Sequence, residues 1–125
     1  MQKILCPASY FSVDETCAAV AAGAVAEFSF FVLSHATAIE QTMIDDERHR
    51  FPPVTLESVI EKIGAVGPAS CVISSDSGSY VLPPPVEAFR EMIVMINSGG
   101  FDDDAIRLMA AGNPAKLFLE RGSGS

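Results

Sequence analysis

Residues 71–78 read Cys-Val-Ile-Ser-Ser-Asp-Ser-Gly. The first five are apolar or small and include the β-branched Val72 and Ile73, which predicts a short buried strand. Asp76 stands directly after that strand, and the following Ser77-Gly78 is typical of a turn. We therefore expect Asp76 at the carboxyl end of the strand, where parallel α/β sheets collect their ligands.

Strands and helices alternate on both sides of this stretch. Apolar runs predict strands, and amphipathic spacing predicts helices. In chain order we expect strand 4–6, helix 12–23, strand 24–31, helix 36–45, helix 56–66, strand 71–75, helix 86–98, a short helix 102–111 and a last turn 115–119. Such alternation predicts an α/β fold, a parallel sheet covered by helices.

Start and stop signals support the helices. Ser12 and Glu15 have the spacing of a capping box, and Thr55 and Asp102 are suitable N-caps for the helices that follow them. Gly99-Gly100 ends the long helix before it. The helix boundaries therefore follow from local chemistry.

Composition restricts the class of protein. The chain has 125 residues, of which 49% are hydrophobic, so it suits one compact domain with a core. We expect a single α/β domain over residues 1–120 and a flexible tail over residues 121–125.

A net charge of −8 without a basic stripe argues against nucleic-acid binding. The longest apolar run is too short and too interrupted to span a bilayer. Three cysteines without metal-type spacing predict reduced thiols and a cytoplasmic location.

Three strands are few for a parallel sheet, because they leave exposed edges. A (β/α) barrel has eight strands in about 250 residues, so this chain has about half that length. Three interpretations remain open: assembly with another chain, a fragment of a larger barrel, or a small open sheet.

Several motifs occur in a particular order. They are the strand and turn at 72–78, Pro83-Pro84-Pro85, the helix 86–98, Gly99-Gly100-Phe101-Asp102 and Asn113-Pro114-Ala115-Lys116-Leu117-Phe118. This order resembles the C-terminal end of the metal-dependent amidohydrolase superfamily, which are TIM-barrel hydrolases. The clear resemblance covers about Ser70 to Leu119, with a weaker extension back to about Ser12. It implies the C-terminal half of a TIM-like barrel that acts on a small-molecule substrate.

The resemblance also assigns roles. It matches Asp76 to the aspartate that ligates metal or moves a proton in these enzymes, and it implies a divalent metal such as zinc. The family's paired histidines on its first strand are absent from this sequence. His35, which follows the apolar run 24–31 by a few residues, is our second candidate metal ligand. The alternative is that His35 lies in a surface loop.

One aspartate cannot hold a catalytic metal, since such sites use about three protein ligands. We therefore expect a hydrolase that is active only when missing strands or a complementing chain supply further ligands, as in a homo-oligomer. The alternative is a non-catalytic α/β interaction module in which Asp76 only caps a turn. Glu27, a single charge inside an apolar run, is either a site residue or an end-of-strand cap. His49, between two arginines, is expected to be solvated.

Overall fold

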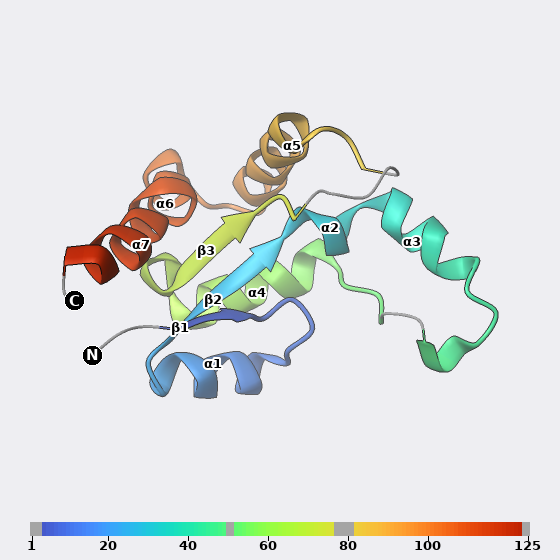
Figure 1. Ribbon diagram of the computed structural model, residues 1–125, viewed down its shortest axis with the longest axis horizontal. Helices are drawn as coiled ribbons and strands as arrows, with labels where there is room; N and C mark the ends of the chain where they lie inside the picture. Colours follow the sequence, from blue (N-terminus) through green and yellow to red (C-terminus); the bar gives the residue numbers. More distant parts are fainter. Residues whose placement is uncertain (1–3, 50–51, 77–81, 124–125) are drawn as a thin grey trace.

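The computed structural model describes residues 4–49, 52–76 and 82–123, and it has an α/β architecture (Figure 1). Strands β1 (Ile4–Pro7), β2 (Ala24–Ser29) and β3 (Cys71–Ser74) form one parallel sheet in the order β1-β2-β3. The helices are α1 (Val13–Ala21), α2 (Phe30–Leu33), α3 (His35–Thr42), α4 (Leu56–Val66), α5 (Pro85–Ser98), α6 (Asp103–Arg107) and α7 (Asn113–Ser123). Short turns η1 (Glu47–His49), η2 (Pro68–Ser70) and the π-helical η3 (Leu108–Gly112) complete them. The predicted parallel α/β sheet is therefore confirmed.

The predicted helix starts are confirmed in atomic detail. Ser12 and Glu15 exchange two hydrogen bonds of 3.0 Å, each from a backbone N–H to the other's side chain. Thr55 accepts a hydrogen bond of 3.1 Å from the N–H three residues on, and Asp102 accepts one of 2.8 Å in the same way. These caps satisfy N–H groups that a helix leaves unpaired at its start.

Three boundaries differ from the sequence-based expectation. The helix expected over residues 36–45 is α3, which begins at His35 and already ends at Thr42. Phe30 and Phe31 belong to α2 and not to a strand, because β2 has no partner beyond the pairing of Ser29 with Ser74. The short helix after Asp102 continues through η3 into α7, which runs to Ser123. Residues 121–123, which we assigned to a tail, are therefore helical. Pro114, which has no N–H to donate, directly follows the π-helical turn η3 and the residue after it.

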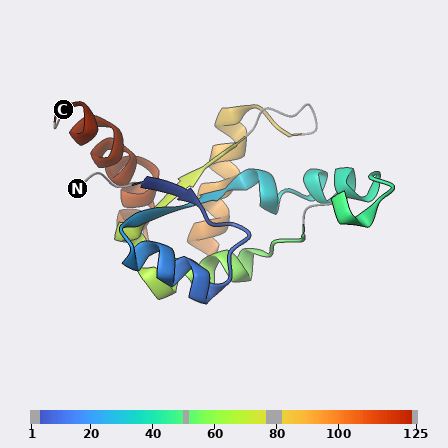
Figure 2. The same cartoon turned by 60° about the horizontal axis from the view of Figure 1, so that its bottom comes forward.

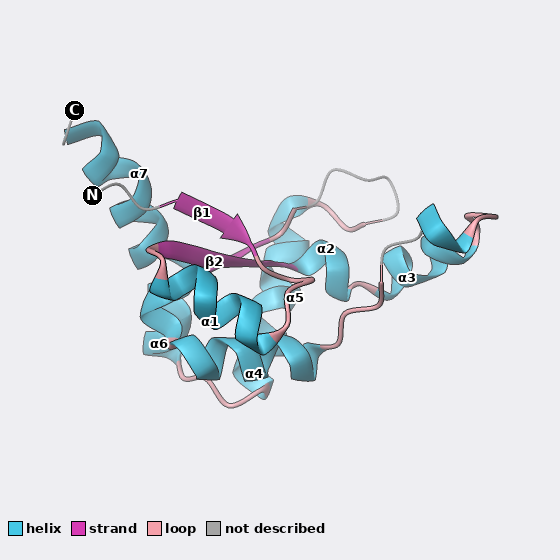
Figure 3. Ribbon diagram, turned by 90° about the horizontal axis from the view of Figure 1, so that it is seen from below, coloured by secondary structure: helices cyan, strands magenta, loops and turns pink. Residues whose placement is uncertain are grey.

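One face of the sheet carries the core. Strand residues from β2 and β3 form one buried apolar cluster with α4 and α5: Ala26, Phe28, Cys71, Ile73, Val59, Ile63, Met92 and Ile96. Figure 3 shows α1, α4 and α6 on the same side of the strands. This follows from the strand order, because two right-handed crossovers that step in one direction place their helices on one face.

The other face has a different composition. Side chains alternate along a strand, so Val25, Glu27 and Ser29 of β2 point away from Ala26 and Phe28. Their register partners on that face are Leu5, Pro7, Val72 and Ser74. We call this the open face. It is apolar at the start of the strands and polar at their carboxyl ends.

Two further features complete the fold. Figure 2 shows α3 and η1 extending away from the sheet, and α7 contacts β3 near the beginning of that strand. Among the described helices, none is both long and apolar enough to cross a membrane.

Candidate functional site

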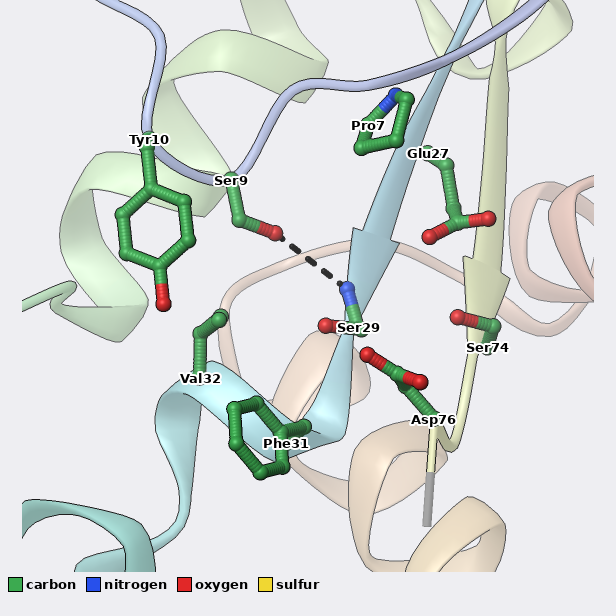
Figure 4. Close-up of a pocket in the computed structure, with 9 residues that line it drawn as sticks. All are labelled: Pro7, Ser9, Tyr10, Glu27, Ser29, Phe31, Val32, Ser74 and Asp76. Atoms are coloured by element: carbon green, nitrogen blue, oxygen red, sulfur yellow. Dashed lines mark hydrogen bonds between the residues drawn. The ribbon is translucent and has the colours of Figure 1, made fainter. Parts of the chain in front are cut away.

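A cleft of about 550 Å³ lies at the carboxyl end of the open face. Four of its lining residues come from the strands, namely Pro7, Glu27, Ser29 and Ser74. Figure 4 shows these side chains with those of the segments that follow each strand. The cleft therefore occupies the position at which parallel α/β sheets bind ligands.

Asp76 lies where the sequence predicts, just beyond the carboxyl end of β3. Its side chain is exposed and points into the cleft on the side of Ser29 (Figure 4). Its backbone is left-handed, with φ of 46°, a conformation that few residues other than Gly adopt and that Asp and Asn tolerate best. Such strained positions often accompany functional sites. The alternative role as a turn cap concerns residues 77–81, which lie outside the described residues.

Glu27 is the second carboxylate of the cleft. It lies within β2 and not at its end, with Pro7 and Val72 as register neighbours. Burial raises the pKa of Glu27, and the negative charge of Asp76 raises it further. Of the two interpretations of Glu27, this position therefore favours a site residue.

The segment between β1 and α1 supplies Ser9 and Tyr10. Ser9 is buried, and its hydroxyl accepts a hydrogen bond of 3.4 Å from the N–H of Ser29. Burial raises the pKa of Tyr10, with a further contribution from the charge of Asp76. Neither residue is among the candidates that the sequence suggests, although both follow β1 as Asp76 follows β3. The same rule applied to every strand end would have found them.

Ser74 and α2 complete the lining. The hydroxyl oxygen of Ser74 is buried and has no hydrogen-bond partner in the described structure, a rare state for a buried polar atom. Phe31 and Val32 of α2 form an apolar wall. The cleft thus combines two carboxylates and several hydroxyls with a hydrophobic side, and no Lys or Arg is among its described lining residues.

The structure tests the expectation for His49 but not the one for His35. His35 is the first residue of α3, but its side chain lies outside the described part of the structure, so its metal-binding role stays a prediction. His49 is 75% exposed, with Nδ1 4.0 Å from Oδ2 of Asp46. The expectation that His49 is solvated is therefore confirmed.

The described residues do not complete a metal site. Among them, no group of three His, Cys, Asp or Glu side chains is close enough to hold an ion. Glu27 and Asp76 offer two carboxylates where a catalytic metal needs about three protein ligands. The described residues therefore do not fit a resident metal by themselves.

The three cysteines are all free thiols. Cys71 belongs to the core, and burial raises the pKa of its thiol to about 12. Cys6 and Cys17 are half-buried. Cys71 is therefore a packing residue and not a nucleophile, since the thiolate is the reactive form.

Comparisons with protein-family models, with curated proteins and with solved structures found no match to this chain. Any functional assignment consequently depends on the chain's own residues.

Proposed function

We propose that this chain is the C-terminal part of an amidohydrolase-type hydrolase whose site is the cleft at the carboxyl ends of the strands. The observation that carries the proposal is the pairing of Asp76 and Glu27. Glu27 of β2 and Asp76, which follows β3, line one cleft, and burial together with the charge of Asp76 raises the pKa of Glu27. Carboxyl pairs in unlike environments are a common arrangement for acid–base chemistry.

The strand order supports a barrel-like arrangement. The sheet is parallel and sequential, and the described helices of its core pack on one face. In a (β/α) barrel the opposite face of such a sheet is the interior, and the active site lies at the carboxyl ends of the strands. We propose that the open face of this chain is that interior face, in the C-terminal half of a TIM-like barrel.

The two carboxyl groups suit different steps of hydrolysis. Asp76, exposed in the cleft, takes a proton from the attacking water as a general base. Glu27, whose pKa is raised by burial and by the charge of Asp76, donates a proton to the leaving group as a general acid. Each bond cleaved consumes one water, and the two carboxyl groups regain their protonation states by exchange with solvent.

Completion of the site requires groups beyond the described residues. We propose that a divalent metal such as zinc binds only when missing strands or a complementing chain add ligands, with Asp76 and His35 as the candidate ligands from this chain. The three free cysteines are consistent with a reducing, cytoplasmic compartment.

The test is hydrolysis of a panel of small amides and esters by the assembled protein. We expect Asp76→Asn and Glu27→Gln each to lower kcat by about 10²–10⁴-fold, the usual contribution of a general acid or base. Asp45→Asn is the matched control, because Asp45 is exposed and lies near the end of α3, outside the cleft. Full activity of both cleft variants would contradict the proposal.

A second candidate function is a non-catalytic interaction module. It is favoured by Ile4, which is 72% exposed on β1 at an edge of the sheet. Exposed strand edges pair readily with other strands. Ile4→Lys tests this candidate, because a charged side chain there would prevent assembly by the β1 edge, whereas Asp76→Asn separates it from the first. Under this candidate, Asp76→Asn would alter neither assembly nor any other measured property.

A further inference from the structure

Lys62 is a buried cation outside the cleft. It lies in α4 with an exposed fraction of 3%. Its ammonium nitrogen lies 2.8 Å from the carbonyl oxygen of Ser9, 2.9 Å from that of Phe11 and 3.3 Å from that of Ala8. A lysine ammonium has three N–H donors, so these carbonyl groups match its hydrogen-bonding capacity.

The surroundings of Lys62 make this contact costly to lose. The ammonium nitrogen lies 5.7 Å from the centre of the Phe28 ring, which favours a cation by its negative face. Burial lowers the pKa of Lys62, and the charge of Glu61 opposes this effect. A buried charge needs partners, and the main-chain carbonyl groups of residues 8–11 supply them.

Residues 8–11 are the segment that brings Ser9 and Tyr10 to the cleft. On the side of the sheet, the N–H of Ala8 donates a hydrogen bond of 2.9 Å to the carbonyl oxygen of Glu27. The Ser9 hydroxyl is bonded to the N–H of Ser29. On the other side, Lys62 holds the carbonyl groups. The segment is thus fixed between β2 and α4.

We propose that Lys62 is a positioning residue for the cleft. Through three main-chain carbonyl groups it holds Ser9 and Tyr10 beside the two carboxylates, although it does not line the cleft itself. The proposal builds on the proposed function only in treating the cleft as the site, and its test needs neither turnover nor metal. Failure of this proposal is therefore distinguishable from failure of the hydrolase proposal.

The first measurement uses Tyr10 as a probe. The chain has no Trp and two Tyr residues, so a Tyr80→Phe background leaves Tyr10 as the one emitting residue. Lys62→Met keeps an apolar stem and removes the three donors. Tyr10 is 44% exposed in the intact protein, so we expect acrylamide quenching of its fluorescence at pH 7 to increase up to about twofold as local opening exposes the segment. Lys116→Met, which removes an exposed lysine of α7, is the matched control and should leave the quenching unchanged.

Amide hydrogen exchange gives the second measurement. In Lys62→Met we expect the amides of Ala8, Phe11 and Ser29 to exchange at least about tenfold faster, while core amides such as those of Ile63 and Met92 keep their protection. Unchanged exchange at residues 8–11 would overturn the proposal. A uniform increase that includes the core would also overturn it, because Lys62 would then be a general stability residue.

The unmodified protein provides a test if Lys62→Met does not fold. A buried ammonium held by three carbonyl groups exchanges its protons slowly. We expect a resolved ammonium signal for Lys62 in a ¹H–¹⁵N spectrum at neutral pH, with nuclear Overhauser contacts to Ser9 and Phe11. A rapidly exchanging signal without these contacts would overturn the proposal.

Discussion

The two faces of the sheet differ although the same strands build both. On the helix-covered face, alternate residues such as Ala26, Phe28 and Ile73 are buried in the apolar core. On the open face, their neighbours Glu27 and Ser29 line a cleft that combines carboxyl and hydroxyl groups with an apolar wall. A strand exposes its two sides to different environments, so one short segment contributes to stability with one set of residues and to a site with the other.

The largest effect should come from the covered face. Phe28 is fully buried, and its ring also faces the ammonium of Lys62. We expect Phe28→Ala to lower the free energy of unfolding by about 3–5 kcal/mol, from lost burial and the cavity left behind. Urea unfolding measures this, with Ser29→Ala on the open face as the comparison. A similar loss in both variants would contradict the difference between the faces.

Thiol labelling of Cys71 compares the covered face of the native protein with the unfolded chain. The pKa of Cys71, raised to about 12 from an ordinary value of 9.0, leaves about a thousandfold less thiolate near pH 8. We expect Cys71 to react with a maleimide about 10³-fold more slowly in the native protein than in urea. Peptide mass analysis at each time point identifies the site. Rapid native labelling of Cys71 would place it outside the core.

The smallest effect should come from Glu27 on the open face, and it depends on pH. The folded-state pKa of Glu27 lies above its ordinary value of 4.5. Its contribution to stability is therefore full below pH 4.5 and is lost as the pH rises through the folded-state value. We expect Glu27→Gln to match the wild type near pH 4 and to exceed it at pH 7 by a few tenths of a kcal/mol, since solvent screens the partly exposed carboxylate.

Chemical denaturation at both pH values measures this difference. The effect should shrink when Asp76→Asn removes the neighbouring charge. Identical pH profiles for the wild type and Glu27→Gln would mean that the carboxylates are not coupled in the cleft.

The sequence predicts the parts of the fold that depend on neighbouring residues. The capping box of Ser12 and the N-cap of Thr55 are local, and so is the position of Asp76 after β3. The end of β2 is not local, because it depends on where β3 stops pairing. For this reason the sequence predicts a strand β2 that is two residues longer than the one in the structure.

The site could be predicted only in part. The position of Asp76 follows from the strand before it, and Glu27 stands out from its apolar surroundings, which left its role open between a site residue and an end-of-strand cap. Lys62 was missed because lysine is rarely buried and its partners lie more than 50 residues away in the chain. No local pattern encodes such a contact. The ligands of the proposed metal cannot be deduced from the sequence, because a candidate such as His35 depends on the tertiary placement of its side chain.

Metal content and mass in solution, measured on the same sample of the wild type and of Asp76→Asn, test the central claim most directly. A hydrolase-type site in the cleft predicts that the assembled wild-type protein holds about one divalent metal ion per completed site. It also predicts that Asp76→Asn loses that ion while its mass stays the same. A stable assembly that holds no metal, or an Asp76→Asn variant that retains the ion, would contradict it.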